Sequence, residues 1–229
     1  MASGNPQHVT ITVDEGRQVS GLLQLPPDAR ACYVLAHGAG AGMAHPFLAS
    51  IANGLSDRGV ATLRYQFPYM EQGSKRPDSP PVAHATVRAA VAEAARLAPG
   101  LPLFAGGKSF GGRMTSQAQA AAPLPGVAGL VFLGFPFHPA GRPSEERAQH
   151  LFGVDIPMLF LQGTRDELAD LPLVQKIAGQ LGARANLKLF TDADHSFHVP
   201  ARSGRKDHEV QHELLDELVA WIGEKIGSN

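Results

Sequence analysis

A short apolar run that ends in a glycine- and serine-rich turn is the feature that most constrains the fold. Leu103 to Ala105 are typical of a buried strand, and residues 107–111 (Gly-Lys-Ser-Phe-Gly) fit the pattern G-x-S-x-G. Gln117 to Ala122 follow as a run of good helix formers. A strand, a tight turn and a helix are the context in which this pattern holds a serine hydroxyl clear of a sheet. The sequence therefore predicts a nucleophile at Ser109.

The turn has two other interpretations. A glycine- and serine-rich turn can lack chemistry altogether. The letters Gly-Lys-Ser also match the end of a phosphate-binding loop, but that pattern requires a glycine five residues before Gly107, where Pro102 stands. The residues that would cradle a phosphate belong to the apolar strand instead, so the sequence argues against a nucleotide site.

Apolar runs of strand length alternate with segments of helical periodicity along the chain. We expect an N-terminal antiparallel hairpin over Val9–Val13 and Val19–Leu25, and a long proline-containing loop over Gln66–Pro81. Alternation of strands and helices predicts an α/β fold with a doubly wound, mostly parallel sheet, in one domain over residues 1–229. The further strands are expected at Cys32–Ala36, Val60–Tyr65, Val127–Leu133, Met158–Leu161 and Leu187–Phe190. The further helices are expected at Phe47–Leu55, Val87–Leu97, Leu171–Leu181 and Val210–Ile226.

Composition excludes several classes of function. The net charge is −1 and no long basic run occurs, so nucleic acid is not an expected partner. The single cysteine, Cys32, rules out an internal disulfide framework. The sequence contains no run of 18 apolar residues, so we expect no membrane span. Met1 to His8 lack the features of a signal peptide, and we therefore expect a cytoplasmic protein. No cluster has metal-ligand spacing, and no metal or cofactor is expected.

The predicted nucleophile needs a base, and the base needs an acid. His195 follows the last predicted strand, where a loop can fold back over Ser109, and His198 is the fallback. Asp166 follows the strand before that and precedes His195, which gives the chain order serine, acid, histidine. Two neighbouring carboxylates are alternatives for the acid, Glu167 and Asp170.

Groups that would stabilise and bind a substrate also lie after predicted strands. The amide of Phe110 begins the helix after the nucleophile, and the glycine-rich loop after Ala36 supplies a second amide, for which Ala39 is preferred over Gly38 or Gly40. Five residues are predicted to contact the substrate: Met43, Phe67, Tyr69, Phe135 and His138. Lys108 could steer an anionic substrate, although the favoured interpretation is that it simply carries charge at the sheet edge. Arg113 could bind a carboxylate or pair with a buried acid, and the structural role is favoured.

These motifs, in this order, resemble the α/β-hydrolases over nearly the full chain. A narrower resemblance is to a small branch without a cap domain, which includes bacterial hydrolase-like proteins, the testis-expressed family and a subunit of a histone-acetyltransferase complex. The matching segments are residues 37–40, Arg64 with residues 67–69, and residues 107–113, 136–139 and 163–167. The dienelactone hydrolases are a broader relative, but they typically use cysteine where this chain has Ser109.

The resemblance implies an α/β-hydrolase fold with no large cap and a Ser-His-Asp triad. The expected function is hydrolysis of a small ester or thioester, a small-molecule substrate, through an acyl-enzyme intermediate. A homodimer is compatible with this function. The alternative is a non-catalytic protein-interaction module on the same scaffold, because relatives occur in regulatory complexes.

Overall fold

An eight-stranded sheet forms the centre of the computed structural model, which describes residues 5–227. The strands lie in the order β1-β2-β4-β3-β5-β6-β7-β8. β1 and β2 form an antiparallel hairpin, β2 also runs antiparallel to β4, and the remaining neighbours are parallel. The strand bounds are Gln7–Asp14, Arg17–Gln24, Ala31–Ala36, Val60–Tyr65, Leu103–Lys108, Val127–Leu133, Met158–Gly163 and Ala185–Phe190, for β1 to β8 in turn. The predicted α/β class, with its mostly parallel sheet and N-terminal hairpin, is confirmed.

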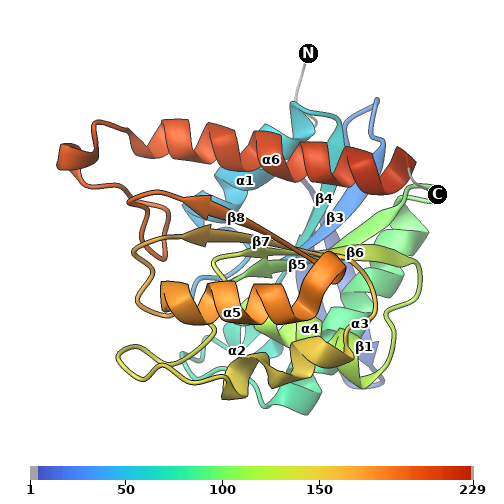
Figure 1. The fold of residues 1–229 in the computed structure, drawn as a ribbon. Helices are drawn as coiled ribbons and strands as arrows, with labels where there is room; N and C mark the ends of the chain where they lie inside the picture. The colour runs from blue at the N-terminus through green and yellow to red at the C-terminus, as the bar shows by residue number, and fades with distance from the viewer. Residues whose placement is uncertain (1–4, 228–229) are drawn as a thin grey trace.

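Helices cover both faces of the sheet (Figure 1). α1 and α6 lie on one face, and α3, α4 and α5 lie on the other. The helix bounds are Pro46–Ser56, Pro68–Glu71, Pro80–Leu97, Phe110–Ala121, Leu171–Leu181 and Asp207–Gly227, for α1 to α6 in turn. The residues described contain no large cap over the carboxyl edge of the sheet, as the sequence predicted.

Burial explains why the central strands are continuously apolar. Every residue of β3, β4 and β7 is buried, because helices cover the sheet above and below. The sheet thereby divides the core into two layers, one under α1 and α6 and one over α3, α4 and α5. In the first layer the ring of Trp221 in α6 packs edge-on against Phe104 in β5. This packing holds β5, the strand that carries the predicted nucleophile, at the middle of the molecule.

Several element boundaries in the structure differ from the predicted ones. The expected loop over Gln66–Pro81 contains α2 and ends at the start of α3, where Pro80 and Pro81 occupy the first turn. Proline is tolerated there because the first amides of a helix have no intrahelical acceptor. α4 begins at Phe110, where the sequence predicted the N-terminus of this helix, although Gly111 and Gly112 in its first turn have weak helix propensity. A 3₁₀ segment, η1, over Glu146–Gly153 had no counterpart in the prediction.

Candidate active site

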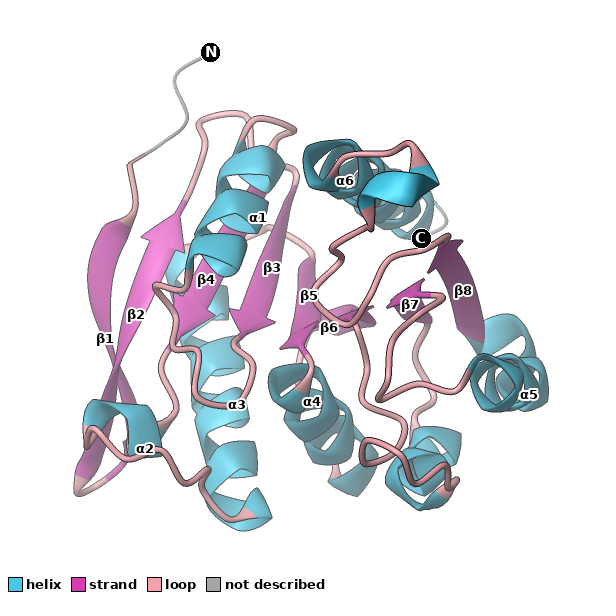
Figure 2. Ribbon diagram, turned by 90° about the vertical axis from the view of Figure 1, so that its left-hand side faces the viewer, coloured by secondary structure: helices cyan, strands magenta, loops and turns pink. Residues whose placement is uncertain are grey.

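Ser109 stands on a strained turn between β5 and α4. Its backbone has φ 49° and ψ −115°, a conformation that residues other than glycine rarely adopt. In Figure 2 the carboxyl ends of β3 and β5 lie beside the start of α4. A Cβ on Gly107 would lie 2.2 Å from the carbonyl oxygen of Ala36, and one on Gly111 would lie 2.6 Å from that of His37. Glycine at both positions therefore lets strand and helix meet closely enough to form the turn.

A series of two hydrogen bonds links Ser109 to His195 and His195 to Asp166. Nε2 of His195 lies 2.9 Å from Oγ of Ser109, and Nδ1 lies 2.7 Å from Oδ2 of Asp166. The three residues come from the carboxyl ends of β5, β8 and β7, so parallel strands bring them together from distant parts of the chain. The carboxylate of Asp166 is fully buried, while the His195 side chain is partly exposed. The sequence placed all three side chains at this edge of the sheet.

Two further groups fix the orientation of the Asp166 carboxylate. Nε2 of Gln162 donates to Oδ2 at 2.5 Å, and the amide of Leu168 donates to Oδ1 at 2.8 Å. Gln162 is itself held by the amide of Phe135, which donates to its Oε1 at 2.9 Å. Sequence reasoning missed Gln162, because a glutamine at the end of a strand carries no signal of which carboxylate it will meet.

Lys108 anchors the loop that carries His195. Its Nζ donates to the carbonyl oxygen of His195 at 2.5 Å and lies 5.8 Å from the ring centre of Phe197. Burial lowers the pKa of Lys108 from 10.5 to about 8, and the nearby carboxylates of Asp166 and Asp194 partly oppose this change. The Lys108 side chain thus holds the His195 loop, a contact that the sequence did not predict.

The fallback base His198 faces a different partner. Its Nδ1 lies 2.7 Å from Oδ2 of Asp207, and its side chain is largely exposed. The hydrogen bond with Asp207 raises the pKa of His198. The structure therefore pairs His198 with the start of α6 and pairs His195 with Ser109.

The glycine-rich loop after β3 is held beside the nucleophile by aromatic groups. His37 accepts a hydrogen bond from the amide of Phe67 at 3.2 Å, and Gly40 donates its amide to the Tyr69 hydroxyl at 2.8 Å. Burial lowers the pKa of His37 to about 4, so the ring is neutral and can accept this bond at ordinary pH. Within residues 5–227, no protein group accepts a hydrogen bond from the Ala39 amide. The amide of Phe110 is the first of α4 and has no intrahelical acceptor.

Ser109 lies between two cavities. The larger, of about 650 Å³, is lined by His195 and by the apolar residues Phe47 and Leu48 at the start of α1. The smaller, of about 390 Å³, is lined by Phe110 and Met114 of α4 and by polar residues of other segments. Ala39 and Ser109 border both cavities, so a substrate carbonyl at Ser109 could extend a group into each.

The five predicted substrate-contact residues lie beneath the site. All are buried and none borders either cavity beside Ser109. Phe67 packs edge-on against Phe110, and Phe135 packs edge-on against Phe132 and Phe160. Nε2 of His138 accepts from the amide of Asp170 at 2.7 Å, while the carbonyl of Met43 accepts from Arg64 at 3.2 Å. These residues and Tyr69 support the loops around Ser109, and their contact with substrate stays a prediction.

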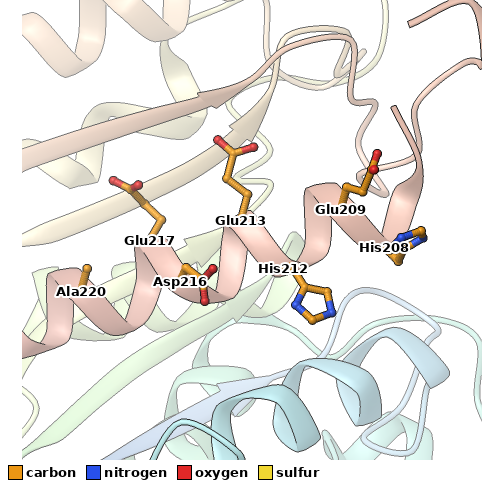
Figure 3. Close-up of a pocket in the computed structure, with 7 residues that line it drawn as sticks. All are labelled: His208, Glu209, His212, Glu213, Asp216, Glu217 and Ala220. Carbon is orange, nitrogen blue, oxygen red and sulfur yellow. The ribbon is translucent and has the colours of Figure 1, made fainter. Parts of the chain in front are cut away.

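A hollow of about 610 Å³ along α6 lacks the Ser-His-Asp grouping found at Ser109. Its side chains project from successive turns of the helix (Figure 3). Asp216 pairs with Arg58 at 2.8 Å, and Glu213 and Glu217 lie 3.3 and 3.1 Å from Lys188 in β8. These ion pairs attach α6 to the sheet and to the segment after α1. The hollow therefore belongs to the structural contacts of the helix.

Neither a metal cluster nor a membrane-spanning helix is found in the part of the chain that the structure describes. Among residues 5–227, no three His, Cys, Asp or Glu side chains are grouped so that they could hold a metal ion. No helix in that range combines the length and apolar character needed to cross a membrane.

A doubly wound sheet with a serine on a strained strand-to-helix turn, facing a histidine and a buried carboxylate, defines the α/β hydrolases as a class. The chain belongs to this family, because the family model described as "Alpha/beta hydrolase domain" matches residues 29–223. The narrower branch predicted from the sequence is not identified by this match and stays a prediction.

Several solved structures share the fold at low sequence identity. Dienelactone hydrolase from Anabaena variabilis ATCC 29413 is 21% identical, with 96% of this chain and 98% of that chain covered and a TM-score of 0.74. XC6422 from Xanthomonas campestris, described as a member of the α/β serine hydrolases without lid, is 21% identical, with 96% and 97% covered and a TM-score of 0.72. Est1E from Butyrivibrio proteoclasticus is 15% identical, with 96% and 99% covered and a TM-score of 0.73.

Proposed function

We propose that the protein is a serine hydrolase that cleaves a small ester or thioester through a Ser109-His195-Asp166 triad. The observation that carries the proposal is the hydrogen-bonded series from Ser109 through His195 to Asp166 on a strained turn. A serine hydroxyl is a weak nucleophile alone, and a histidine within hydrogen-bond distance can accept its proton. The similarity to XC6422, described as a member of the α/β serine hydrolases without lid, supports the same class.

The reaction follows from the positions of these groups. Oγ of Ser109 attacks the carbonyl carbon, and its proton passes to Nε2 of His195. Asp166 accepts the Nδ1 hydrogen bond, fixes the tautomer of His195 and stabilises the imidazolium. The amides of Phe110 and Ala39 stabilise the oxyanion, each donor contributing roughly 3 to 4 kcal/mol to lowering the barrier.

Collapse of the tetrahedral intermediate completes the first half of the reaction. The bond from the carbonyl carbon to the alcohol oxygen or thiol sulfur breaks, and His195 returns the proton to this leaving group. Water then attacks the acyl group on Ser109, with His195 again accepting a proton. Release of the acid restores the serine hydroxyl.

Labelling with a fluorophosphonate probe, followed by mass spectrometry of the modified residue, tests this proposal. We expect modification at Ser109, and strong reduction of labelling and of short p-nitrophenyl ester hydrolysis in His195→Ala. His208→Ala is the matched control, because His208 is exposed on α6 and lies outside the triad. Well-folded protein that neither reacts with the probe nor hydrolyses esters would contradict the proposal and favour the protein-interaction module.

A further inference from the structure

The smaller cavity beside Ser109 contains two arginines. Arg113 lies one helical turn after Ser109 on α4, and its amide donates to the Ser109 carbonyl at 3.1 Å. Arg147 reaches the same cavity from η1. The hydrogen bond of 2.7 Å between Oγ of Ser116 and Nε2 of His150 fixes η1 against α4. Both guanidinium groups therefore belong to elements held in place around the nucleophile.

Neither arginine has an acidic partner among the residues that the structure describes. No salt bridge within residues 5–227 includes Arg113 or Arg147. Nε of Arg113 is buried and has no hydrogen-bond partner among the described residues. Burial, and then the charge of Arg147, lower the pKa of Arg113. Two like charges placed together and partly removed from water are unfavourable unless an anion compensates them.

The other charged and titratable groups at this cavity do not supply that anion. Asp78 lines the cavity, but its Oδ2 accepts from the amide of Tyr69 at 3.1 Å and it forms no salt bridge with either arginine. His150 does not line the cavity but lies near Arg113, and burial and the charge of Arg113 lower its pKa to about 4, which leaves this ring neutral. The two guanidinium groups outnumber the carboxylate, so the cavity carries a net positive charge.

We propose that this cavity binds a carboxylate carried by the substrate, so that the preferred ester or thioester is an anionic one. The proposal rests on the proposed function, because it places the scissile carbonyl at Ser109. Arg113 is four residues after Ser109, which is one helical turn or roughly 6 Å of rise along α4, so its side chain starts close to the reacting serine. A half-ester of a short dicarboxylic acid carries its carboxylate close to the scissile carbonyl in the same way. The larger cavity, where Phe47 and Leu48 supply apolar surface, then takes the uncharged part of the substrate.

Matched pairs of esters test the preference. Mono-p-nitrophenyl glutarate against p-nitrophenyl pentanoate places the carboxylate in the acyl part, and 4-acetoxybenzoate against methyl 4-acetoxybenzoate places it in the leaving group. We expect kcat/KM to favour the anionic member of one pair by about tenfold to a hundredfold, the range typical of hydrogen bonds to charged groups. The pair that shows the preference identifies which part of the substrate occupies the cavity. Equal kcat/KM within both pairs would overturn the proposal.

Substitution of each arginine tests whether the preference for the anionic ester arises at this cavity. Arg113→Gln and Arg147→Gln should each lower the ratio of kcat/KM for the anionic ester to kcat/KM for the neutral ester by about tenfold. The change should come from a lower kcat/KM for the anionic ester. Arg142→Gln is the matched control, since Arg142 is an exposed arginine before η1 that does not line the cavity, and it should keep the wild-type ratio. A ratio unchanged in both folded variants, or equal losses on both esters, would refute the subsite. Arg147→Gln remains informative if Arg113→Gln fails to fold.

Ligand binding measured without hydrolysis tests the carboxylate site independently of the hydrolase proposal. Calorimetry should detect monomethyl glutarate binding to Ser109→Ala, weakened about tenfold in Ser109→Ala/Arg147→Gln. If binding follows this pattern while the wild-type protein hydrolyses no ester, the carboxylate site stands and the hydrolase proposal fails. If esters are hydrolysed but no binding or anionic preference is found, the carboxylate site fails and the hydrolase proposal stands.

Discussion

The buried ammonium of Lys108 predicts how stability changes with pH. The pKa of Lys108 is lowered to about 8 in the folded protein, mainly because burial disfavours the charged form, against 10.5 for a free lysine. Between pH 8 and pH 10.5 the unfolded chain therefore binds one more proton than the folded protein. The free energy of unfolding should rise with pH across this window by about 3 kcal/mol, and stay flat for this group below and above it.

Lys108→Met isolates that contribution, because methionine keeps an unbranched side chain and does not titrate. The difference in unfolding free energy, wild type minus variant, should increase by about 3 kcal/mol as the pH rises from about 7.5 to 10.5. Burial also raises the pKa of Tyr33 and Tyr65, but these groups are common to both proteins and cancel in the difference. Removal of the ammonium also leaves the His195 carbonyl without this donor, which costs about 1 to 3 kcal/mol at every pH.

Urea unfolding followed by circular dichroism, at half-unit pH steps, measures this difference. Lys176→Met is the control, because that lysine is 56% exposed and pairs with Glu145 at the surface. Its difference from the wild type should vary by less than about 0.5 kcal/mol over the same pH range. A Lys108→Met difference that is equally flat would refute the argument that burial controls the charge of Lys108.

Three further outcomes are expected. Gly111→Ala should lower the urea midpoint strongly, because its Cβ would meet the Ala36 side chain at 2.6 Å, whereas Gly179→Ala in α5 has open space and should stabilise by about 0.5 to 1 kcal/mol. Asp166→Asn should reduce kcat for p-nitrophenyl esters by about 10⁴-fold with little change in urea midpoint, since the wrong His195 tautomer is then favoured. The pKa of His37, about 4 instead of 6.5, should raise wild-type stability relative to His37→Gln by about 3 kcal/mol from pH 4 to 6.5, as measured by urea unfolding.

The strands and the order of the chemical groups were predictable because their signals are local. Apolar runs such as Cys32–Ala36 mark strands buried on both faces, and the Gly107 to Gly111 turn marks the nucleophile by spacing alone. Parallel strands end at one edge of the sheet, so placing His195 and Asp166 after strands was enough to predict that they approach Ser109.

The supporting contacts could not be predicted because they join residues far apart in the chain. Lys108 meets the carbonyl of His195 across 87 positions, and nothing near Lys108 in the sequence indicates that contact. Tyr69 was expected to face substrate because aromatic residues on loops after strands can do so. The structure buries its ring, and its hydroxyl accepts a hydrogen bond from the amide of Gly40, a contact that the sequence did not indicate. The local sequence pattern does not determine how deeply a loop side chain is buried or which group it contacts.

The separation of Ser109 from His195 has a consequence for synthesis of the protein. His195 lies 86 residues after Ser109 and follows β8, which is the outermost strand at one edge of the sheet. A growing chain that ends before that strand has the serine but no base to accept its proton. Such a chain should not react with fluorophosphonates, even if β3 to β7 have already paired. Nucleophilic reactivity therefore appears only when the last strand is added, and its appearance would report completion of the sheet during translation.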